Sequence, residues 1–490
     1  MRINIPDKNI FNNKCILIFL IAFVVIFPST YNPLNLKRMH IDSSVYMTVT
    51  NGIINGFLPY RDLVDNKGPL TYLINVPGFY LGGFTGVWLT LFVLMFVSVL
   101  FAYKTALFFG SRFAALLGTA FCFVLINLPH SISAEVEEFS MPFLMISIYI
   151  ITKYYFSTER NISFYELIIL GFCFSSAVMI RINMFPLWAG FCLIIFIESI
   201  IKRRFVQLLK YIAGFCTGIG IVFIPVFIYL GANGITGDFI EQVILGGTAR
   251  GFIYTNINEI SKSFFIVFNR DYTFFPLFFT FYYCIKKYRT DVFYYYLGFG
   301  LSFILMALSL SFLDNTPHHN IVFMPLFLVS LTVLIHKFDT SYLKNRKIML
   351  VLFLCLIFSE GILKYFYNVP KIFNDNSGTL LVNAGKIIDE NTNPGDTIIS
   401  LGIQGYIYPF TQRHSASRYF YQGAGVNFIP GARENFINDI LTGKPKIIAF
   451  FTEDRGSDYM QDWHAAIFEM IGREYRILSN ENNFELFIRD

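Results

Sequence analysis

The stretch HIDSSVYMTVTNGIINGFLPYRDLVDNKGPLTYLI, residues 40–74, lies between two long apolar segments and decides the class of fold. Within it, Asp42, Arg61, Asp62, Asp65 and Lys67 share one short connection, with Pro and Gly between them. Ionisable side chains at the level of a membrane are costly to place there and are candidates for function. The stretch therefore points to chemistry at a membrane surface.

The composition is that of a membrane protein with many spans. The chain has 490 residues, of which 55% are hydrophobic and 14% are charged, which is far from the balance of a soluble enzyme. The net charge is +5, and no concentrated basic patch accompanies it, so no nucleic-acid partner is expected. All seven cysteines fall inside apolar runs, which argues against a disulfide framework or a zinc site.

A helix needs about 20 apolar residues to cross a membrane, and by this measure the chain contains about eleven spans. The first also resembles a secretory signal, but no small-residue cleavage site follows, so we expect a retained anchor. An alternative is that the fifth and sixth spans together form one re-entrant pair. The expected spans are 13–31, 74–102, 106–128, 138–156, 164–181, 184–201, 208–231, 263–285, 291–313, 320–336 and 348–367.

The charges of the connecting loops predict the orientation. With the N-terminus in the cytoplasm, basic segments such as KRRFVQLLK (202–210) fall on the cytoplasmic side, as the positive-inside rule requires. The loops on the opposite side are richer in acids, and an odd number of spans places the tail outside the cytoplasm. The heavy use of Ile, Phe, Asn and Lys fits an AT-rich bacterial genome. We therefore expect a multi-pass protein of the bacterial plasma (inner) membrane.

The tail changes character near residue 370. NPGDTIISLG, KPKIIAFF, REYRIL and FELFIRD read as short strands, and SGTLLVNAGKIIDEN reads as a helix. The predicted organisation is therefore a transmembrane domain over 1–369, with a first outer loop at 32–73, followed by a small extracytoplasmic α/β domain over 370–490.

The opening stretch itself predicts an amphipathic helix at the membrane interface. Val45, Val49, Ile53 and Phe57 recur every four residues, which indicates a helix over 43–57. Asp42 precedes this helix at the N-cap position, so its alternative role is that of a helix cap.

Two further outer loops carry polar residues. They are SAEVEEF (133–139) and DNTPHHN (314–320), and by the predicted topology they lie on the same side of the membrane as residues 40–74. Carboxylates, a lysine and a histidine pair are thus expected to converge in a cleft under the tail. Arg181, in RINMFP, either meets a phosphate there or extends to the interface, which is the more usual role of such an arginine.

These residues carry a family resemblance. D…Y…G…PYRD…D.KGPL.Y is similar to the first outer loop of GT-C glycosyltransferases that use lipid-linked sugars, specifically the bacterial group like protein O-mannosyltransferases and aminoarabinose transferases. EEFSMPF, PHHNIVFMP and SRYFYQ also resemble segments of that group, in the same order along nearly the whole chain. One departure is Asn66, because the aminoarabinose enzymes have Glu directly before the Lys.

The resemblance implies roles for individual residues. Asp42 occupies the place of the catalytic base or metal-site acid, and Asp65 and Lys67 occupy the segment that contacts metal or donor phosphate. It also singles out Glu137 and Tyr60 as substrate-binding residues. The spacing to Pro325 favours His318 over His319 as a group that binds phosphate or orients the sugar.

The chemistry of such a transfer needs a base and a cation. Asp42 is expected to accept the proton of the acceptor hydroxyl in an inverting displacement, while Lys67 and Arg61 compensate the charge of the leaving phosphate. A divalent ion such as Mg²⁺ or Mn²⁺, held by Asp42 and Asp65, is a further expected contribution. Arg61 alternatively anchors to lipid headgroups, and Glu137 alternatively pairs with a basic residue.

The expected function is therefore transfer of a sugar from a polyprenyl-phosphate donor to an acceptor outside the cytoplasm, which is a cell-wall polymer, a lipid or a protein. The alternatives are a transporter or flippase of lipid-linked glycans, and a glycan polymerase. Alternating access predicts charged residues near the middle of the spans and repeat symmetry, and neither is visible in the sequence. A polymerase usually has its long functional loop late in the chain, whereas here the richest loop is the first.

Overall fold

The computed structural model describes residues 11–490 except 37–38, 125–131, 159, 247–261, 263, 265, 267–273, 287–289, 291, 312–316, 340–345, 376, 403–404, 424–428, 452–457 and 482–483. The chain divides into two compact units. The first comprises Met1–Ser29, Leu89–Val226 and Phe252–Lys371, and the second comprises Thr30–Trp88, Phe227–Gly251 and Ile372–Asp490. The tail thus shares its unit with the first outer loop, and the predicted boundary at 369/370 stays a prediction.

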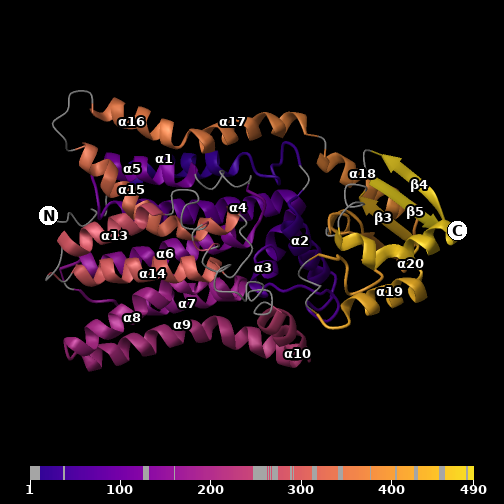
Figure 1. The fold of residues 1–490 in the computed structure, drawn as a ribbon, viewed down its shortest axis with the longest axis horizontal. Helices are drawn as coiled ribbons and strands as arrows, with labels where there is room; N and C mark the ends of the chain where they lie inside the picture. Colours follow the sequence, from indigo (N-terminus) through magenta and orange to yellow (C-terminus); the bar gives the residue numbers. More distant parts are fainter. Residues whose placement is uncertain are drawn as a thin grey trace. The chain divides into compact units, whose positions relative to one another are not determined.

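The first unit is helical (Figure 1). Its α7 and α9 approach so closely that a Cβ on Gly171 would lie 2.0 Å from the Phe215 carbonyl oxygen, so only glycine fits there. The helices with all or part of their length in this unit are α1 (Phe11–Ile26), α4 (Val76–Ala106), α5 (Arg112–Val124), α6 (Val136–Phe156), α7 (Phe164–Ile180), η3 (Ile182–Met184), α8 (Pro186–Ile201), α9 (Phe205–Ala232), α13 (Phe274–Lys286), α14 (Phe293–Ser311), η5 (Pro317–Phe323), α15 (Met324–Asp339), α16 (Arg346–Ile357) and α17 (Ser359–Asn374).

The length and composition of these helices identify a membrane protein. Among the described residues, five helices are long and apolar enough to cross a membrane, or six if the bent pair formed by α16 and the helices after it is one span. Four other predicted spans overlap shorter apolar helices, and much of the span predicted at 263–285 lies outside the described residues, so the count of about eleven stays a prediction. The span expected at 348–367 is interrupted, because α16 ends at Ile357 and α17 begins at Ser359.

In the second unit, α2 (Ile41–Ile54) departs from the sequence prediction. It begins two residues earlier than expected, with His40 at the N-cap, so Asp42 lies in its first turn and is not the N-cap residue. The helix is buried along Ser43–Thr50 on all sides, so the predicted amphipathic pattern was wrong, whereas its predicted place at the membrane interface stays a prediction. The reason is tertiary, because the tail covers α2: Gly405 N donates to Ser44 Oγ, and Thr48 Oγ1 donates to the Gly405 carbonyl.

The tail contains the four predicted strands, and a short fifth that the sequence did not indicate. They form one sheet in the order β2-β1-β3-β5-β4, with β1 parallel to β2 and β3, and β5 antiparallel to β3 and β4. The central strands are almost wholly buried, as expected for strands covered on both faces. The strands are β1 (Thr397–Leu401), β2 (His414–Ser415), β3 (Ile447–Phe451), β4 (Tyr475–Glu481) and β5 (Phe484–Arg489).

Helices α18 (Ser377–Glu390), α19 (Ala432–Gly443) and α20 (Asp458–Glu474) accompany this sheet (Figure 1). The unit also holds α3 (Leu70–Leu73), α10 (Thr236–Phe239), the short π-helix η4 (Ile240–Leu245) and the 3₁₀ helix η6 (Tyr408–Phe410). The fold thus brings three stretches that are far apart in sequence into one unit.

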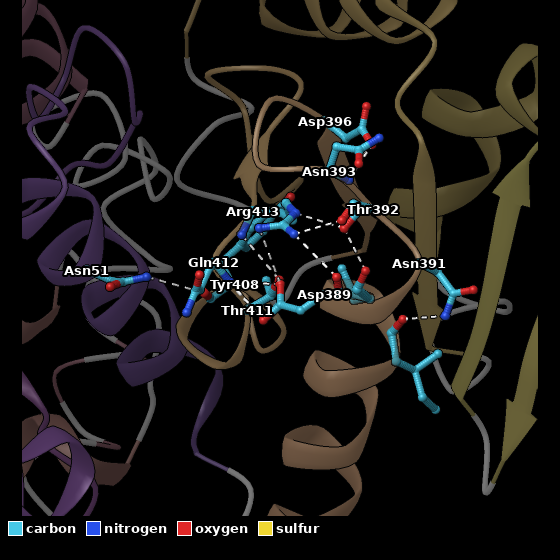
Figure 2. Close-up of polar contacts among 12 residues, drawn as sticks. Asn51, Asp389, Asn391, Thr392, Asn393, Asp396, Tyr408, Thr411, Gln412 and Arg413 are labelled. Atoms are coloured by element: carbon cyan, nitrogen blue, oxygen red, sulfur yellow. Dashed lines mark hydrogen bonds and ion pairs between the residues drawn. The ribbon is translucent and has the colours of Figure 1, made fainter.

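A buried arginine fixes the loop between β1 and β2. Arg413 donates from Nε to Thr392 Oγ1 and from Nη2 to the Thr392 carbonyl, both at 2.8 Å, as Figure 2 shows. Asp389, at the end of α18, accepts from Thr411 Oγ1 at 2.6 Å. Asn51 of α2 reaches the same loop through the Tyr408 carbonyl (Figure 2). The loop that covers α2 is therefore hydrogen-bonded both to the C-terminal end of α18 and to α2 itself.

Candidate active site

Asp42 is the exposed acid at the start of α2. Its Oδ2 accepts a hydrogen bond from the Tyr46 hydroxyl, one turn later, at 3.4 Å. A carboxylate in the first turn is favoured by the unpaired N–H groups of a helix start. Burial lowers the pKa of His40 to about 4 although Asp42 raises it, so this imidazole is neutral at neutral pH. Asp42 is accordingly placed to meet a molecule from solvent.

The turn that follows α2 is held by a buried tyrosine. Tyr60 adopts a φ of 69°, is fully buried, and donates its hydroxyl to the Lys67 carbonyl at 2.9 Å. Its neighbour Arg61 is exposed and pairs with Asp62 at 3.1 Å. The structure thus places Tyr60 as a support of the loop, and the substrate-binding role predicted for it stays a prediction. Arg61 is accessible, and its predicted role is likewise untested.

Asp65 is buried at the centre of this turn. It is 3% exposed, and its Oδ2 accepts from the Tyr72 hydroxyl at 2.7 Å. Its Oδ1 accepts from the Tyr421 hydroxyl at 3.1 Å and from Asn66 N at 2.8 Å. A buried carboxylate requires such donors to offset its lost hydration. Burial, followed by the charge of Asp65, raises the pKa of Tyr72 well above its ordinary value, so the phenol remains a donor.

Lys67 is a buried cation in the same turn. Its side chain is 9% exposed, its ammonium donates to Asn66 Oδ1 at 2.8 Å, and it lies 5.7 Å from the centre of the Tyr46 ring. Within the described residues, no carboxylate lies within ion-pair distance of this ammonium. A buried charge without an acidic partner is costly and favours an anionic ligand. Tyr46 contacts both of the side chains that are predicted to react, Asp42 through its hydroxyl and Lys67 through its ring.

Sequence reasoning missed the residues that hold this turn from elsewhere in the chain. Gln242 of η4 accepts from Asp65 N at 3.3 Å and donates to the Tyr60 carbonyl at 2.7 Å. Arg418 also donates to the Tyr60 carbonyl, at 2.5 Å, and pairs with Asp238 at 3.3 Å. The SRYFYQ segment was a visible signal for Arg418 and Tyr421, whereas nothing in the sequence marked Gln242.

The first unit contains a separate polar cluster. Glu137, in the first turn of α6, forms an ion pair with Arg181, the C-cap residue of α7. Arg181 also contacts Nε2 of His319 in η5 at 3.1 Å, and that nitrogen lies 3.9 Å from Glu137 Oε1. Glu137 thus pairs with a basic residue, as its alternative role predicted, and the substrate-binding role predicted for it stays a prediction. The side chain of His318 lies outside the described residues, and the predicted convergence of the three outer loops stays a prediction.

Removing the acid of this cluster is expected to destabilise the first unit. The Glu137 side chain is fully buried and that of Arg181 is 15% exposed. Breaking a buried pair leaves an uncompensated charge, so Glu137→Ala should cost about 3–5 kcal/mol. The measurement is the thermal midpoint of the purified protein in detergent. The matched control is Glu469→Ala, which breaks an exposed pair with Arg473 and should cost at most about 1 kcal/mol. Equal midpoints for the two variants would contradict the prediction.

The placement of Asp65 does not fit a metal site that uses it. Both of its oxygens already accept hydrogen bonds from Tyr72, Tyr421 and Asn66 N. In the described part of the chain, no three His, Cys, Asp or Glu side chains gather closely enough to hold a metal ion. The Mg²⁺ or Mn²⁺ site of Asp42 and Asp65 therefore remains a prediction without geometric support, and no step below passes through a metal.

Comparisons with known proteins place the fold. No protein-family model matches the chain, and no curated protein matches it. ArnT from Cupriavidus metallidurans bound to undecaprenyl phosphate has a TM-score of 0.61 at 11% identity, covering 96% of this chain and 97% of that chain. The Archaeoglobus fulgidus oligosaccharyltransferase tethered with an acceptor peptide containing the NVT sequon has a TM-score of 0.53 at 12% identity, covering 99% and 75%. This chain has the fold of the GT-C membrane glycosyltransferases, the class that its sequence motifs resemble.

Proposed function

We propose that this protein transfers a sugar from a polyprenyl-phosphate donor to an acceptor outside the cytoplasm, with Asp42 as the base. The observation that carries the proposal is the pair formed by Asp42 and Lys67 around Tyr46. An exposed carboxylate and a buried ammonium without an acidic partner among the described residues share one side chain as their neighbour. A base and an anion-binding cation are the two groups that this transfer requires.

The reaction is a single displacement. The acceptor oxygen attacks the anomeric carbon as the bond from that carbon to the phosphate oxygen breaks, which inverts the configuration. The acceptor proton passes to Asp42, and the electrons of the broken bond leave with the polyprenyl phosphate. Lys67 compensates the charge that develops on the phosphate, and the Tyr46 hydroxyl holds the Asp42 carboxylate for the proton transfer.

The comparisons support the choice of donor. The ArnT structure is described as bound to undecaprenyl phosphate, and that of AglB from Archaeoglobus fulgidus as a complex with an inhibitory peptide and a dolichol-phosphate. Both ligands are polyprenyl phosphates, so a lipid of this class is the donor we propose here. The acceptor is a cell-wall polymer, a lipid or a protein. Arg61 and His318 are proposed to assist at the phosphate, and Glu137 to orient the substrate through its contact with Arg181.

Transfer by membranes that contain the protein tests the function. Polyprenyl-phosphate donors with different radiolabelled sugars are incubated with these membranes and with membranes from cells that lack the chain. The expected result is protein-dependent incorporation of label into an acceptor, with release of one polyprenyl phosphate for each sugar transferred. If no donor is consumed, while vesicles with the purified protein move lipid-linked glycans between leaflets, the protein is a flippase and the proposal is wrong.

A further inference from the structure

The C-terminal tail reaches the turn that carries Lys67 through one short segment. This segment, SRYFYQ at residues 417–422, contacts the turn at three points within the second unit. Val64 N donates to the Arg418 carbonyl at 3.0 Å, Arg418 Nη2 donates to the Tyr60 carbonyl, and the Tyr421 hydroxyl donates to Asp65 Oδ1 at 3.1 Å. The first of these contacts joins two backbone groups, the second joins a side chain to a backbone carbonyl, and the third satisfies a buried charge.

We infer that Tyr421 is a positioning residue for the Lys67 ammonium, so that the tail forms part of the phosphate site. This inference rests on the proposed function, because it assigns Tyr421 a role in binding the polyprenyl-phosphate donor. Tyr421 acts through Asp65 and does not itself touch the phosphate. The tail thereby has a role beyond covering α2.

The path from Tyr421 to Lys67 is short and consists of hydrogen bonds. The Asp65 carboxylate joins Tyr421 of the tail to Tyr72 at the start of the next helix. The same Tyr72 hydroxyl lies 3.3 Å from the Lys67 carbonyl, which also accepts from the Tyr60 hydroxyl. The Tyr60 hydroxyl thus holds the Lys67 carbonyl directly, and the Tyr72 hydroxyl, whose single proton goes mainly to Asp65, makes a second, longer contact with it. A backbone fixed in this way limits the positions open to the Lys67 ammonium, so less conformational freedom is lost when an anion binds.

The geometry makes Tyr421→Phe a local change. Arg418 keeps both of its contacts with the turn, so the segment remains docked when the hydroxyl is removed. Asp65 Oδ1 then keeps only the hydrogen bond from Asn66 N. A buried carboxylate that loses one donor tends to turn toward other hydrogen-bond donors nearby. Tyr419→Phe is the matched control, because Tyr419 lies in the same segment, is buried, and its hydroxyl makes no hydrogen bond with the described residues.

The experiment measures the affinity of the full chain in detergent for two probes. Undecaprenyl phosphate carries the phosphate, and undecaprenol is the same lipid without it. The wild type and Tyr419→Phe should both bind undecaprenyl phosphate more tightly than undecaprenol, and the ratio of the two affinities should be the same in both proteins. Tyr421→Phe should weaken binding of undecaprenyl phosphate up to about 10-fold, because the ammonium that meets the phosphate is then less well positioned. Binding of undecaprenol should not change, which distinguishes positioning of Lys67 from a general loss of structure.

A double-mutant cycle tests whether Tyr421 acts through Lys67. In a Lys67→Met background, Tyr421→Phe should have no further effect on the preference for the phosphate, because the ammonium that it positions is gone. Asp65→Asn, which keeps one acceptor oxygen, is the second variant if Tyr421→Phe does not fold, and it should reproduce the same loss. An equal loss with both lipids, or an additive cycle, would overturn the inference.

The two levels of proposal fail differently. If the wild type binds undecaprenyl phosphate and undecaprenol equally, the proposed donor is wrong. If Lys67→Met loses the preference while Tyr421→Phe and Asp65→Asn keep it, the donor stands and the role of Tyr421 is overturned.

Discussion

Asp42→Asn is expected to reduce sugar transfer about 10²- to 10⁴-fold, the range that a positioned general base contributes. The amide has the size of the carboxylate and retains an oxygen that accepts from the Tyr46 hydroxyl, so the local structure should persist. What the variant loses is the site for the acceptor proton. The variant also lacks the favourable interaction of a carboxylate with the start of α2, which is worth only about 0.3–1 kcal/mol in stability.

The control for this variant is Asp62→Asn in the same loop. Asp62 pairs with the exposed Arg61, and its other oxygen accepts from Leu58 N at 2.7 Å, a bond that an amide oxygen can still form. Transfer should therefore remain close to that of the wild type. Rates are compared at saturating donor, with equal amounts of protein in the membrane. Activity of Asp42→Asn within a factor of about ten of the wild type would remove the base role.

Lys67→Met is expected to raise the KM for the donor about 10- to 100-fold, since hydrogen bonds to charged groups are worth roughly 1.5–3 kcal/mol. Met has a stem of similar length and shape, so it should occupy the buried position above the Tyr46 ring without an ammonium. Because the phosphate gains charge as the bond to the sugar breaks, kcat should fall as well. Lys67→Arg should recover part of the loss if the larger guanidinium fits.

A lysine elsewhere provides the comparison for Lys67→Met. Lys444, the C-cap residue of α19, has an exposed side chain and pairs with Glu474 at 2.7 Å, so Lys444→Met removes the same charge from an exposed position of the tail. Its KM should equal that of the wild type, because an exposed pair contributes little. A donor KM unchanged in Lys67→Met would show that another cation meets the phosphate, and Arg61 would be the next candidate.

The sequence predicted much of the local structure correctly. Four strands of the tail and helix α18 lie where alternation and helical periodicity placed them. The polar stretch after the first apolar segment was recognised from composition alone, and its motifs pointed to the fold that the comparisons show. Hydropathy could not settle the number of spans, because several helices are too short by themselves to cross a membrane and one predicted span is interrupted at residue 358.

The pairings within the candidate site depended on packing over long distances in sequence. Tyr421 and Asp65 are 356 residues apart, and Gln242 is 177 residues from the same aspartate. The amphipathic pattern of residues 43–57 was also misleading, because the tail buries the face that the pattern assigned to water.

By itself, the sequence determined the membrane class, the strands of the tail and the residue types available for chemistry, since hydropathy and periodicity are local properties of the chain. The tertiary structure decided which of these residues are supports and which are available to a ligand. Asp65 and Tyr60 hold the turn, whereas Asp42 is exposed and Lys67 has no acidic partner among the described residues. The physical reason is that a buried polar group must find its donors and acceptors wherever the fold brings them, and those partners here come from distant segments.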